Sequence, residues 1–278
     1  MSFRTYAQVT GADRSQLGEQ VAAQRERVRA RLAGVEHVVA IMSGKGGVGK
    51  SYVTAAIARG MAPRVARGVG VLDADLASPT TGRLLDAQGP LRVDDEGVHP
   101  ARGSRGVVVC SMDLLLDDGA PLTWREPGSE RFVWRGALEA GALREFLGDV
   151  VWGELDILLI DLPPGTDRLD DLVELVPDLT GAIAVTIPTE ESRRSVERAM
   201  RRAAQAEVRL LGVVENMSGY ACAGCGSIGP LYEGDAGDRL ANAFGIPLLY
   251  RLPFLRGDHA EGAAVRDALA ATCLEVLR

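Results

Sequence analysis

Short hydrophobic runs alternate with helical patterns along most of the chain. The continuous apolar runs predict strands at residues 37–42, 69–72, 106–112, 155–160, 182–187, 210–214 and 248–251. Helical patterns lie at residues 14–33, 50–61, 137–147, 169–175, 190–206, 236–244 and 263–277. Strands that are hydrophobic on both faces and alternate with helices are typical of a parallel sheet covered on both sides. The pattern therefore predicts an α/β fold with a doubly wound, mainly parallel sheet flanked by helices.

A glycine-rich octapeptide, GKGGVGKS, joins the first predicted strand to the following helix and matches the P-loop pattern. Its glycines let successive backbone N–H groups turn inwards and form an anion-binding nest at a helix N-terminus. We expect Lys50 to reach the β- and γ-phosphates of ATP and the Ser51 hydroxyl to bind Mg²⁺. The residues expected to bind the nucleotide here are Gly44, Lys45, Gly46, Gly47, Val48, Gly49, Lys50 and Ser51.

Lysine is almost absent from the composition. The chain has 31 lysine and arginine residues, and the only two lysines, Lys45 and Lys50, both lie in this loop. A compact ammonium on a flexible stem suits a tight phosphate loop better than the planar arginine fork does. The 278 residues can bury one large α/β core. We assign residues 1–35 to an N-terminal helical extension and residues 36–278 to a P-loop ATPase domain with a CxxC loop near residues 219–230.

Three aspartates follow predicted strands. Asp161 ends the strand at 155–160, and Asp73 and Asp75 come directly after the strand at 69–72. Ligands of parallel sheets lie beyond the carboxyl ends of the strands. We expect Asp161 to hold Mg²⁺ through water, Asp73 to help hold the magnesium shell and Asp75 to orient the attacking water. Helix N-capping is the alternative for Asp161 and Asp75.

Other polar residues also follow predicted strands. Asn216 comes just after the strand at 210–214, and its side-chain amide suits the edge of adenine. A turn residue is an equally good interpretation of Asn216. Gly165 and Thr166, after two prolines, are expected to form the loop that senses the γ-phosphate.

Two of the four cysteines, Cys222 and Cys225, form a CxxC pair. Cys110 falls in a predicted strand and Cys273 in the last predicted helix, where each is expected to be a small core residue. One CxxC supplies two of the four thiolates of a soft-metal site, and a twofold dimer could supply the other two. An iron–sulfur cluster, a structural zinc ion and an inert loop are the alternatives for this pair.

Lys45 comes too early in the loop to be the usual P-loop lysine. With it, the KGGVGK sequence resembles the "deviant" P-loop ATPases, which include the MinD/ParA partition proteins, the arsenite-pump and tail-anchor-targeting ATPases and nitrogenase iron protein. The resemblance implies that Lys45 reaches across a dimer interface to the partner's nucleotide. There it would stabilise the charge on the transferring phosphoryl group, so that Lys45, Lys50 and Asp75 form the catalytic set.

Further motifs, in the same order and spacing, resemble the Mrp/ApbC-type iron–sulfur cluster carriers over residues 36–258. These are DADLASPT at 73–80, VWRG at 133–136, DLPPGT at 161–166, ENMS at 215–218 and CAGC at 222–225. The resemblance implies a cytosolic homodimeric ATPase that passes a 4Fe–4S cluster to apo-proteins. The cluster would be held between the Cys222 and Cys225 pairs of two subunits.

The chain departs from this family's pattern near the phosphates. Tyr52 stands where the family usually has threonine, and Asp167 and Arg168 replace a glycine and an aspartate. Ala77 and Ser78 replace an aromatic residue or histidine and a glycine. These changes lead us to expect slow ATP turnover.

The charge balance argues against nucleic acid or an anionic membrane as the default partner. The net charge is −7, no run of 18 apolar residues is present, and residues 1–10 lack the layout of a secretory signal. Few, irregularly spaced cysteines are typical of a reducing cytoplasm. No histidine-based catalysis is expected, because the three histidines lie far from the carboxylate clusters in the predicted elements.

Two other functions stay open. A MinD/ParA-like partition or positioning ATPase would need a DNA or membrane surface, and arginines in the helix at 190–206 could meet DNA. Glu190 and Glu197 stand at i,i+4 spacing from these arginines, however, which favours a solvated face. The arginines are Arg193, Arg194, Arg198, Arg201 and Arg202. The second alternative is a zinc-linked dimeric targeting ATPase.

Overall fold

One large sheet organises the fold. The computed structural model describes residues 17–114, 141, 143–165, 167–222, 224, 225, 227–254 and 260–278. Within these residues the sheet has nine strands in the order β10-β9-β8-β1-β7-β2-β6-β5, and β11 pairs with β9. The strands are β1 (Val35–Met42), β2 (Val69–Asp73), β5 (Ala101–Arg102), β6 (Val108–Cys110), β7 (Leu155–Asp161), β8 (Gly181–Thr186), β9 (Leu210–Ala221), β10 (Ile228–Gly229) and β11 (Leu248–Phe254).

Nearly all strand pairs are parallel, as the hydrophobic runs predict. β1 pairs in parallel with β7 and β8, and β2 pairs in parallel with β7 and β6. Only β5 with β6 and β10 with β9 run antiparallel among the named pairs of this sheet. The carboxyl ends of β1, β2 and β7 therefore meet at one edge, which is where a doubly wound sheet binds its ligand.

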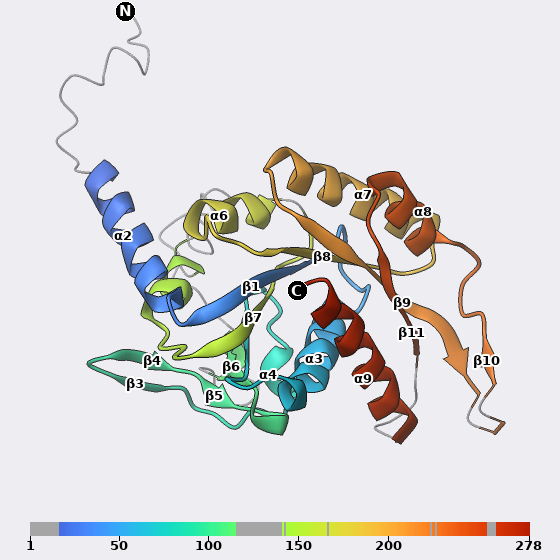
Figure 1. Cartoon of the computed structure of the whole chain (residues 1–278), viewed down its shortest axis with the longest axis horizontal. Helices are drawn as coiled ribbons and strands as arrows, with labels where there is room; N and C mark the ends of the chain where they lie inside the picture. Colours follow the sequence, from blue (N-terminus) through green and yellow to red (C-terminus); the bar gives the residue numbers. More distant parts are fainter. Residues whose placement is uncertain are drawn as a thin grey trace, which may run out of the picture.

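Helices cover both faces of the sheet (Figure 1). The α-helices are α2 (Leu17–Leu32), α3 (Lys50–Met61), α4 (Thr81–Leu84), α6 (Asp167–Leu175), α7 (Glu190–Gln205), α8 (Ala236–Phe244) and α9 (Ala260–Glu275). Short 3₁₀ turns lie at Ala62–Arg64, Ser104–Gly106 and Met112–Leu114. α3 and α9 lie together on one face, and α6, α7 and α8 lie on the other (Figure 1).

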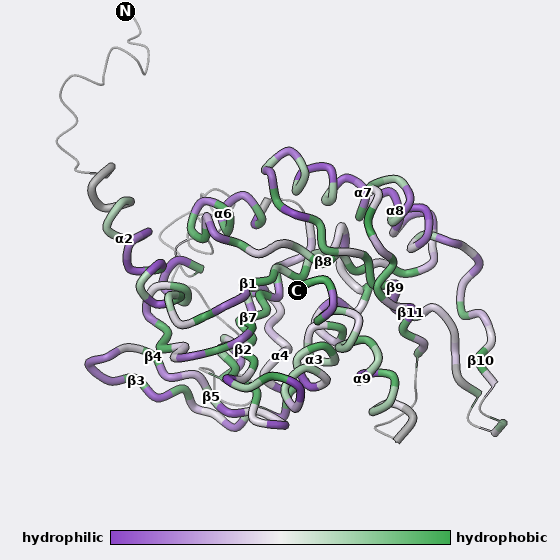
Figure 2. Tube along the Cα trace, in the orientation of Figure 1, coloured by the Kyte–Doolittle hydropathy of each residue, from purple (hydrophilic) through white to green (hydrophobic). Residues whose placement is uncertain are grey.

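Alternate residues of the central strand β1 point to opposite faces of the sheet and belong to two separate hydrophobic cores. Val38 and Ala40 of β1 belong to the core under α6, α7 and α8, whereas Val39 and Ile41 belong to the core under α3 and α9. Both faces of this part of the strand are therefore buried, which is why residues 38–42 of β1 are a continuous hydrophobic run. Figure 2 shows hydrophobic residues along the central strands and hydrophilic ones over α7. The predicted doubly wound α/β fold is confirmed.

The N-terminal helix packs on the main sheet layer. Val28 of α2 is fully buried in the core, and Arg25 donates to Glu174 of α6 at 2.8 Å. α2 ends three residues before β1 begins, which agrees with a helix leading directly into the sheet. The division at residue 35 stays a prediction. No helix in the described ranges is long and apolar enough to span a membrane.

The structure differs from the sequence prediction mainly in short or irregular elements. The hairpin of β3 (Arg92–Asp94) and β4 (Gly97–His99) was not predicted, nor were α4, β5 and β10. These elements have two to four residues each, too few for a periodic pattern. The helix predicted at 137–147 lies partly outside the described residues, with 143–149 helical, and so does the motif at 133–136.

β9 is longer than predicted. The hydrophobic run ends at Val214, but the strand continues to Ala221. Met217 has a φ of 54°, and the pairing of β9 with β11 shifts register between Leu252 and Phe254. This irregularity interrupts the alternation of side chains in β9. The second half of the strand therefore contains polar residues and does not show the hydrophobic pattern by which strands are predicted.

Candidate nucleotide site and cysteine pair

The glycine-rich loop lies at the ligand edge of the sheet, between β1 and α3. Gly47 and Gly49 have φ values of 79° and 78°, in the left-handed region that favours glycine. Gly49 directly precedes α3, and a Cβ there would collide with the Asn216 amide. A Cβ at Gly44 would collide with the backbone of Ser195 in α7. Glycine is therefore required at both ends of the loop.

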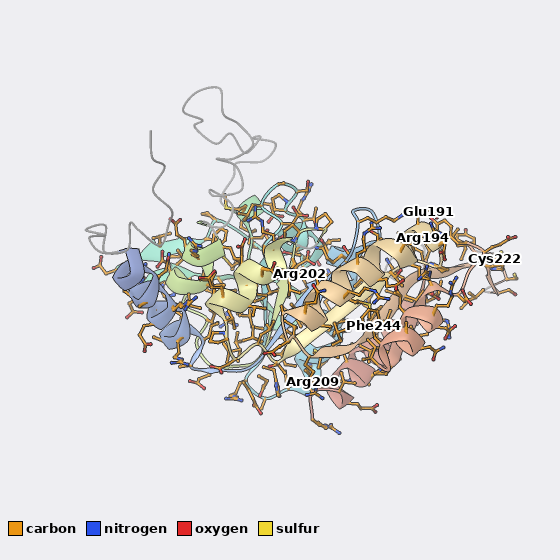
Figure 3. The ribbon with its side chains drawn as sticks, turned by 90° about the horizontal axis from the view of Figure 1, so that it is seen from above. Glu191, Arg194, Arg202, Arg209, Cys222 and Phe244 are labelled. Carbon is orange, nitrogen blue, oxygen red and sulfur yellow. The ribbon has the colours of Figure 1, made fainter. Side chains whose placement is uncertain are left out.

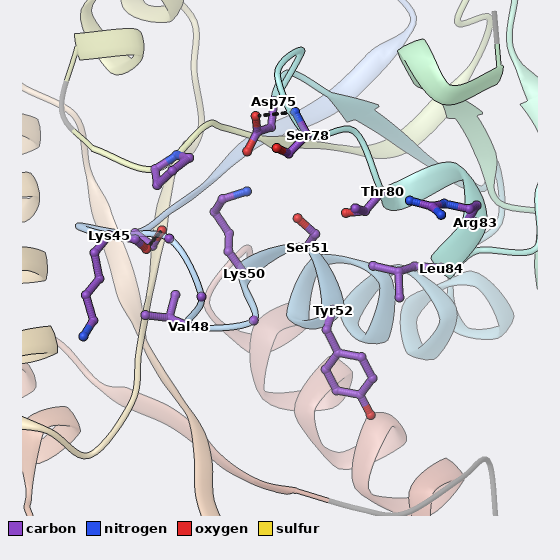
Figure 4. Close-up of a pocket in the computed structure, with 15 residues that line it drawn as sticks. Lys45, Val48, Lys50, Ser51, Tyr52, Asp75, Ser78, Thr80, Arg83 and Leu84 are labelled. Carbon is purple, nitrogen blue, oxygen red and sulfur yellow. Dashed lines mark hydrogen bonds between the residues drawn. The ribbon is translucent and has the colours of Figure 1, made fainter. Parts of the chain in front are cut away.

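An open pocket of about 650 Å³ lies over this loop (Figure 4). The loop and the start of α3 form one wall, and the segment after β2 forms the facing wall. The lining residues include Lys50, Ser51, Tyr52, Asp75, Ser78, Thr80, Arg83, Leu84 and Pro164. The pocket thus brings together the P-loop and the segment of Asp75, as the sequence predicts.

Asp161 at the end of β7 joins the key side chains of the loop. Its carboxylate is completely buried and accepts a hydrogen bond from Lys50 Nζ at 2.7 Å. The Ser51 hydroxyl donates to the second carboxylate oxygen at 2.6 Å, and the Thr54 hydroxyl donates to the first at 2.8 Å. In the described part of the chain this carboxylate accepts only side-chain donors, so the helix-capping alternative for Asp161 is not supported.

Asp73 at the end of β2 holds the next segment in place. Its Oδ2 accepts hydrogen bonds from the backbone N–H of Thr80 and Thr81 at 2.9 and 3.0 Å. The hydroxyls of Thr81 and Ser111 donate to the same oxygen at 3.0 and 3.1 Å. Burial, and secondarily the charge of Asp161, raises the pKa of Asp73 to about 6. A structural role for Asp73 was missed in the sequence, and its expected role at magnesium stays a prediction.

Asp75 lies in the wall of the pocket. Its backbone N–H donates to Asp73 Oδ1 at 3.1 Å, and its own Oδ1 accepts from the backbone N–H of Ser78 at 3.2 Å (Figure 4). Asp75 therefore closes a turn and does not cap a helix. The second oxygen of its carboxylate has no protein donor among the described residues, so it is available to a ligand in the pocket.

The two lysines of the loop point in different directions. Lys50 extends towards Asp75 and Ser51, whereas the side chain of Lys45 leaves the loop on another side (Figure 4). Lys50 is 6% exposed and paired with Asp161. The Lys45 ammonium has no hydrogen-bond or ion-pair partner in the described ranges. This difference is compatible with separate roles, but the cross-subunit role of Lys45 stays a prediction.

Asn216 lies inside β9 and not after it, so the turn interpretation is wrong. Its side chain is 4% exposed, and its Nδ2 donates to the Val48 carbonyl of the P-loop at 2.8 Å. From the opposite side, the Ser195 hydroxyl of α7 donates to the Gly44 carbonyl at 2.7 Å. Both anchors come from segments distant in sequence, so no local pattern could reveal them. Contact of Asn216 with adenine stays a prediction.

The CxxC pair lies between β9 and β10, two strands that pair antiparallel as a hairpin. The Cys222 N–H donates to the Ser227 carbonyl at 2.9 Å, directly after the end of β9. Both cysteines are exposed, and Cys222 lies at one tip of the molecule (Figure 3). Hydrogen bonds from the side chain and backbone of Ser227, and then from Cys222, lower the pKa of the Cys225 thiol.

The other two cysteines are core residues, as predicted. Cys110 and Cys273 are both fully buried. Burial raises the pKa of each thiol to about 12, and the charge of Asp73 adds to the effect at Cys110. Because the thiolate is the metal-binding form, only Cys222 and Cys225 of the four are suited to a metal.

Two glutamates of α7, Glu190 and Glu197, pair with three of the five arginines of this helix. Glu190 accepts hydrogen bonds from Arg193 at 2.8 Å and from Arg194 at 2.9 Å, and these bonds lower its pKa to about 2. Glu197 accepts from Arg201 at 2.7 Å. The predicted i,i+4 pairing is confirmed, and these bonds weaken the case for a DNA-binding face.

One histidine lies beside carboxylates, contrary to expectation. On the β3–β4 hairpin, His99 Nε2 is 2.9 Å from Asp94 Oδ1. Glu96 brings a third potential metal ligand, and the three ligand atoms lie within 4.8 Å of one another. The group is largely exposed and Arg92 already pairs with Asp94. Because the hairpin was not predicted, no sequence pattern connected His99 with Asp94.

Comparison with known proteins decides the family. A ParA-type family model, described as the NUBPL iron-transfer P-loop NTPase, matches residues 34–270. The chain belongs to this family. It is 38% identical to the iron–sulfur cluster carrier protein of Saccharolobus solfataricus over 244 residues, which cover 87% of this chain and 79% of the relative.

Two solved structures are similar to this NUBPL-type chain over most of its length. The nucleotide-binding protein of Archaeoglobus fulgidus, in complex with ADP, has a TM-score of 0.66 and 35% identity over 89% of this chain and 92% of its own. The cell-division ATPase MinD of Pyrococcus furiosus has a TM-score of 0.57 but only 19% identity, over 86% and 99% of the two chains. MinD shares the fold, whereas the closer sequence relationship is with iron–sulfur cluster carriers. The resemblance inferred from the motifs is confirmed.

Proposed function

We propose that this NUBPL-type NTPase hydrolyses ATP and carries a 4Fe–4S cluster, which it delivers to apo-proteins. The observation that supports this most is the separation of the four cysteines into two buried and two exposed residues. The exposed pair, Cys222 and Cys225, lies on a hairpin that leads directly from a strand bonded to the P-loop. The carrier name of the relative at 38% identity supports the same cargo.

The cluster is the cargo, and two copies of the chain would hold it. Four thiolates are needed for a 4Fe–4S cluster, and one chain offers two suitable ones. A twofold axis next to the hairpin would bring together Cys222 and Cys225 of each subunit. The lowered pKa of the Cys225 thiol favours the ligating thiolate. A homodimer is therefore part of this proposal, with neither nucleic acid nor a membrane as partner.

The nucleotide would be Mg-ATP, in the pocket over the loop. The loop N–H groups and Lys50 would hold the phosphates, and Ser51 with Asp161 would hold the magnesium ion and its water. Ser51 and Asp161 are already hydrogen-bonded to each other at 2.6 Å, which suits them to share one ion. Asp75 would orient the water that attacks the γ-phosphorus as the bond to ADP breaks. Lys45 of the partner would stabilise the charge on that phosphoryl group.

Anaerobic reconstitution with iron and sulfide tests the cargo. We expect the wild-type chain to bind about four irons per dimer and the Cys222→Ala/Cys225→Ala variant to bind almost none. A Cys110→Ala/Cys273→Ala variant is the matched control because it keeps the same number of thiols, and it should retain the iron. Unfolding of each variant is monitored by circular dichroism.

Two results would contradict the proposal. Equal iron in wild type and the Cys222→Ala/Cys225→Ala variant would exclude the CxxC pair as the cluster site. Zinc in place of iron in anaerobically purified protein would favour the zinc-linked dimer. Sedimentation velocity with and without Mg-ATP tests the dimer separately.

A further inference from the structure

Tyr52 is an unusual wall residue for a phosphate-binding pocket. It follows Ser51 directly in α3, and its side chain is 39% exposed although it is large and aromatic. Tyr52 is one of the residues that line the pocket over the P-loop. Its hydroxyl has no hydrogen-bond partner among the residues that the structure describes. An internal hydrogen bond therefore does not explain the ring.

The position of Tyr52 indicates which part of a nucleotide it meets. Asp75 lies on one side of Lys50 and Ser51, and Tyr52 lies on the other side (Figure 4). In the proposed function Asp75 faces the terminal phosphate, where hydrolysis occurs. The phosphates of a bound nucleotide would lie against Lys50, so the nucleoside would lie on the side of the loop away from Asp75. That is the side of Tyr52.

A second apolar side chain lies close to the last glycine of the loop. A Cβ at Gly49 would lie 3.7 Å from Met217 Cε of β9. A thioether and an aromatic ring are suited to a flat base and a sugar, and not to phosphate.

We infer that Tyr52 contacts the nucleoside half of the bound nucleotide and thereby selects complete nucleotides over free polyphosphate. This inference rests on the proposed binding of ATP in the pocket. Aromatic rings bind bases by stacking, and the Tyr52 hydroxyl can add a hydrogen bond to the ribose. Tyr52 would then be a specificity-determining residue at a position where the resembled carriers usually have threonine.

The experiment compares Mg-ATP with magnesium tripolyphosphate, which has the phosphates but no nucleoside. Isothermal titration calorimetry is done on wild type, Tyr52→Phe, Tyr52→Ala and Tyr52→Thr. Loss of stacking in Tyr52→Ala and Tyr52→Thr should weaken ATP binding by about 5- to 100-fold. Tripolyphosphate binding should change by less than about twofold. Tyr52→Phe, which keeps the ring, should stay close to wild type for both ligands.

The two ligands separate failure of the inference from failure of the proposed function. If Tyr52→Ala weakens both ligands equally, or weakens neither, Tyr52 does not contact the nucleoside and the inference is wrong while the site stands. If wild type binds neither ligand, the proposed nucleotide site and the inference both fail. Tyr52 is 39% exposed and lies in the first turn of α3, so the variants should fold, and their melting temperatures serve as the check.

Discussion

The P-loop and the cysteine hairpin are built in opposite ways. At the P-loop, Lys50, Ser51 and Thr54 all donate to the buried Asp161 carboxylate. At the hairpin, Cys222 and Cys225 are exposed, and the Cys225 thiol donates to the Ser227 hydroxyl at 3.3 Å. The first site is assembled within one chain, whereas the second presents two thiols to solvent.

This difference suggests that one chain is sufficient to bind the nucleotide, whereas two chains are needed to bind the metal. Preorganised donors can hold phosphates without a further ordering cost, so one chain suffices to bind a nucleotide. Two exposed thiolates leave a soft-metal site half complete, so a second chain is needed to fill it. The nucleotide site should then tolerate loss of the cysteines, and metal binding should tolerate loss of the loop lysine.

The largest effect is expected from Lys50→Gln. This change removes the charge but keeps a donor for Asp161, so the buried carboxylate is not left without a partner. Removing one partner of a buried, charged contact should weaken ATP binding roughly 100-fold or more. Iron binding after anaerobic reconstitution should remain at the wild-type level. Calorimetry and iron analysis measure the two properties on the same preparation.

Lys45→Gln is the matched control because Lys45 is the only other lysine. Its side chain points away from Lys50, so we expect ATP affinity within about threefold of wild type but loss of ATP hydrolysis (Figure 4). An equal loss of ATP affinity in both variants would contradict the separate roles of the two lysines. Loss of iron in Lys50→Gln would contradict the independence of the two sites.

The next effect concerns the stability of the nucleotide-free protein. Burial raises the pKa of Asp73 from 3.8 to about 6. A carboxyl with a raised pKa in the folded state stabilises the fold below about pH 4 and loses this contribution as the pH rises through 6. The free energy of unfolding should therefore fall by roughly 1–3 kcal/mol from pH 4 to pH 7. Urea unfolding without nucleotide or magnesium measures it.

Asp73→Asn should remove this pH dependence. Ser111→Ala is the control, since it deletes one hydrogen bond to the same Asp73 oxygen but leaves the carboxyl able to titrate. The control should lower stability by about 1 kcal/mol at each pH and keep the slope. The same slope in wild type and Asp73→Asn would show that another group causes it.

The sequence was informative wherever residues act together in one segment. The P-loop needs its glycines, Lys50 and Ser51 consecutively, because a nest of N–H groups forms only from neighbouring residues. The strands of the central sheet are buried on both faces, so their hydrophobic runs stand out. The fold class, the pocket wall at Asp75 and the two kinds of cysteine followed from such local signals.

The contacts that anchor the site join distant segments and left no local signal. Asp73 bonds to Thr81 and Ser111, which lie outside the motif at 73–80. The continuation of β9 beyond Val214 depends on its pairing with β11 and on the unusual backbone of Met217. Such features are set by tertiary packing, which overrides the pattern of a single segment.

The smallest effect on ATP binding is expected from a change in β9, the strand that connects the P-loop with the cysteine hairpin. Asn216 donates to the P-loop at Val48, and β9 continues from Asn216 to the residue before Cys222. Asn216→Ala removes one hydrogen bond and should weaken ATP binding about fivefold. If β9 links the sites, the variant should also reduce the effect of ATP on the rate at which a chelator removes iron from the loaded dimer.

Ser195→Ala separates this link from simple weakening of the loop. Ser195 bonds to the same loop at Gly44, but it lies in α7, which does not lead to the cysteines. We expect a similar small loss of ATP affinity and an unchanged effect of ATP on iron release, measured at saturating ATP. Equal responses of the two variants would mean that the loop, and not β9, determines how the hairpin senses nucleotide. A selective loss in Asn216→Ala would identify β9 as the connection between the buried site and the exposed one.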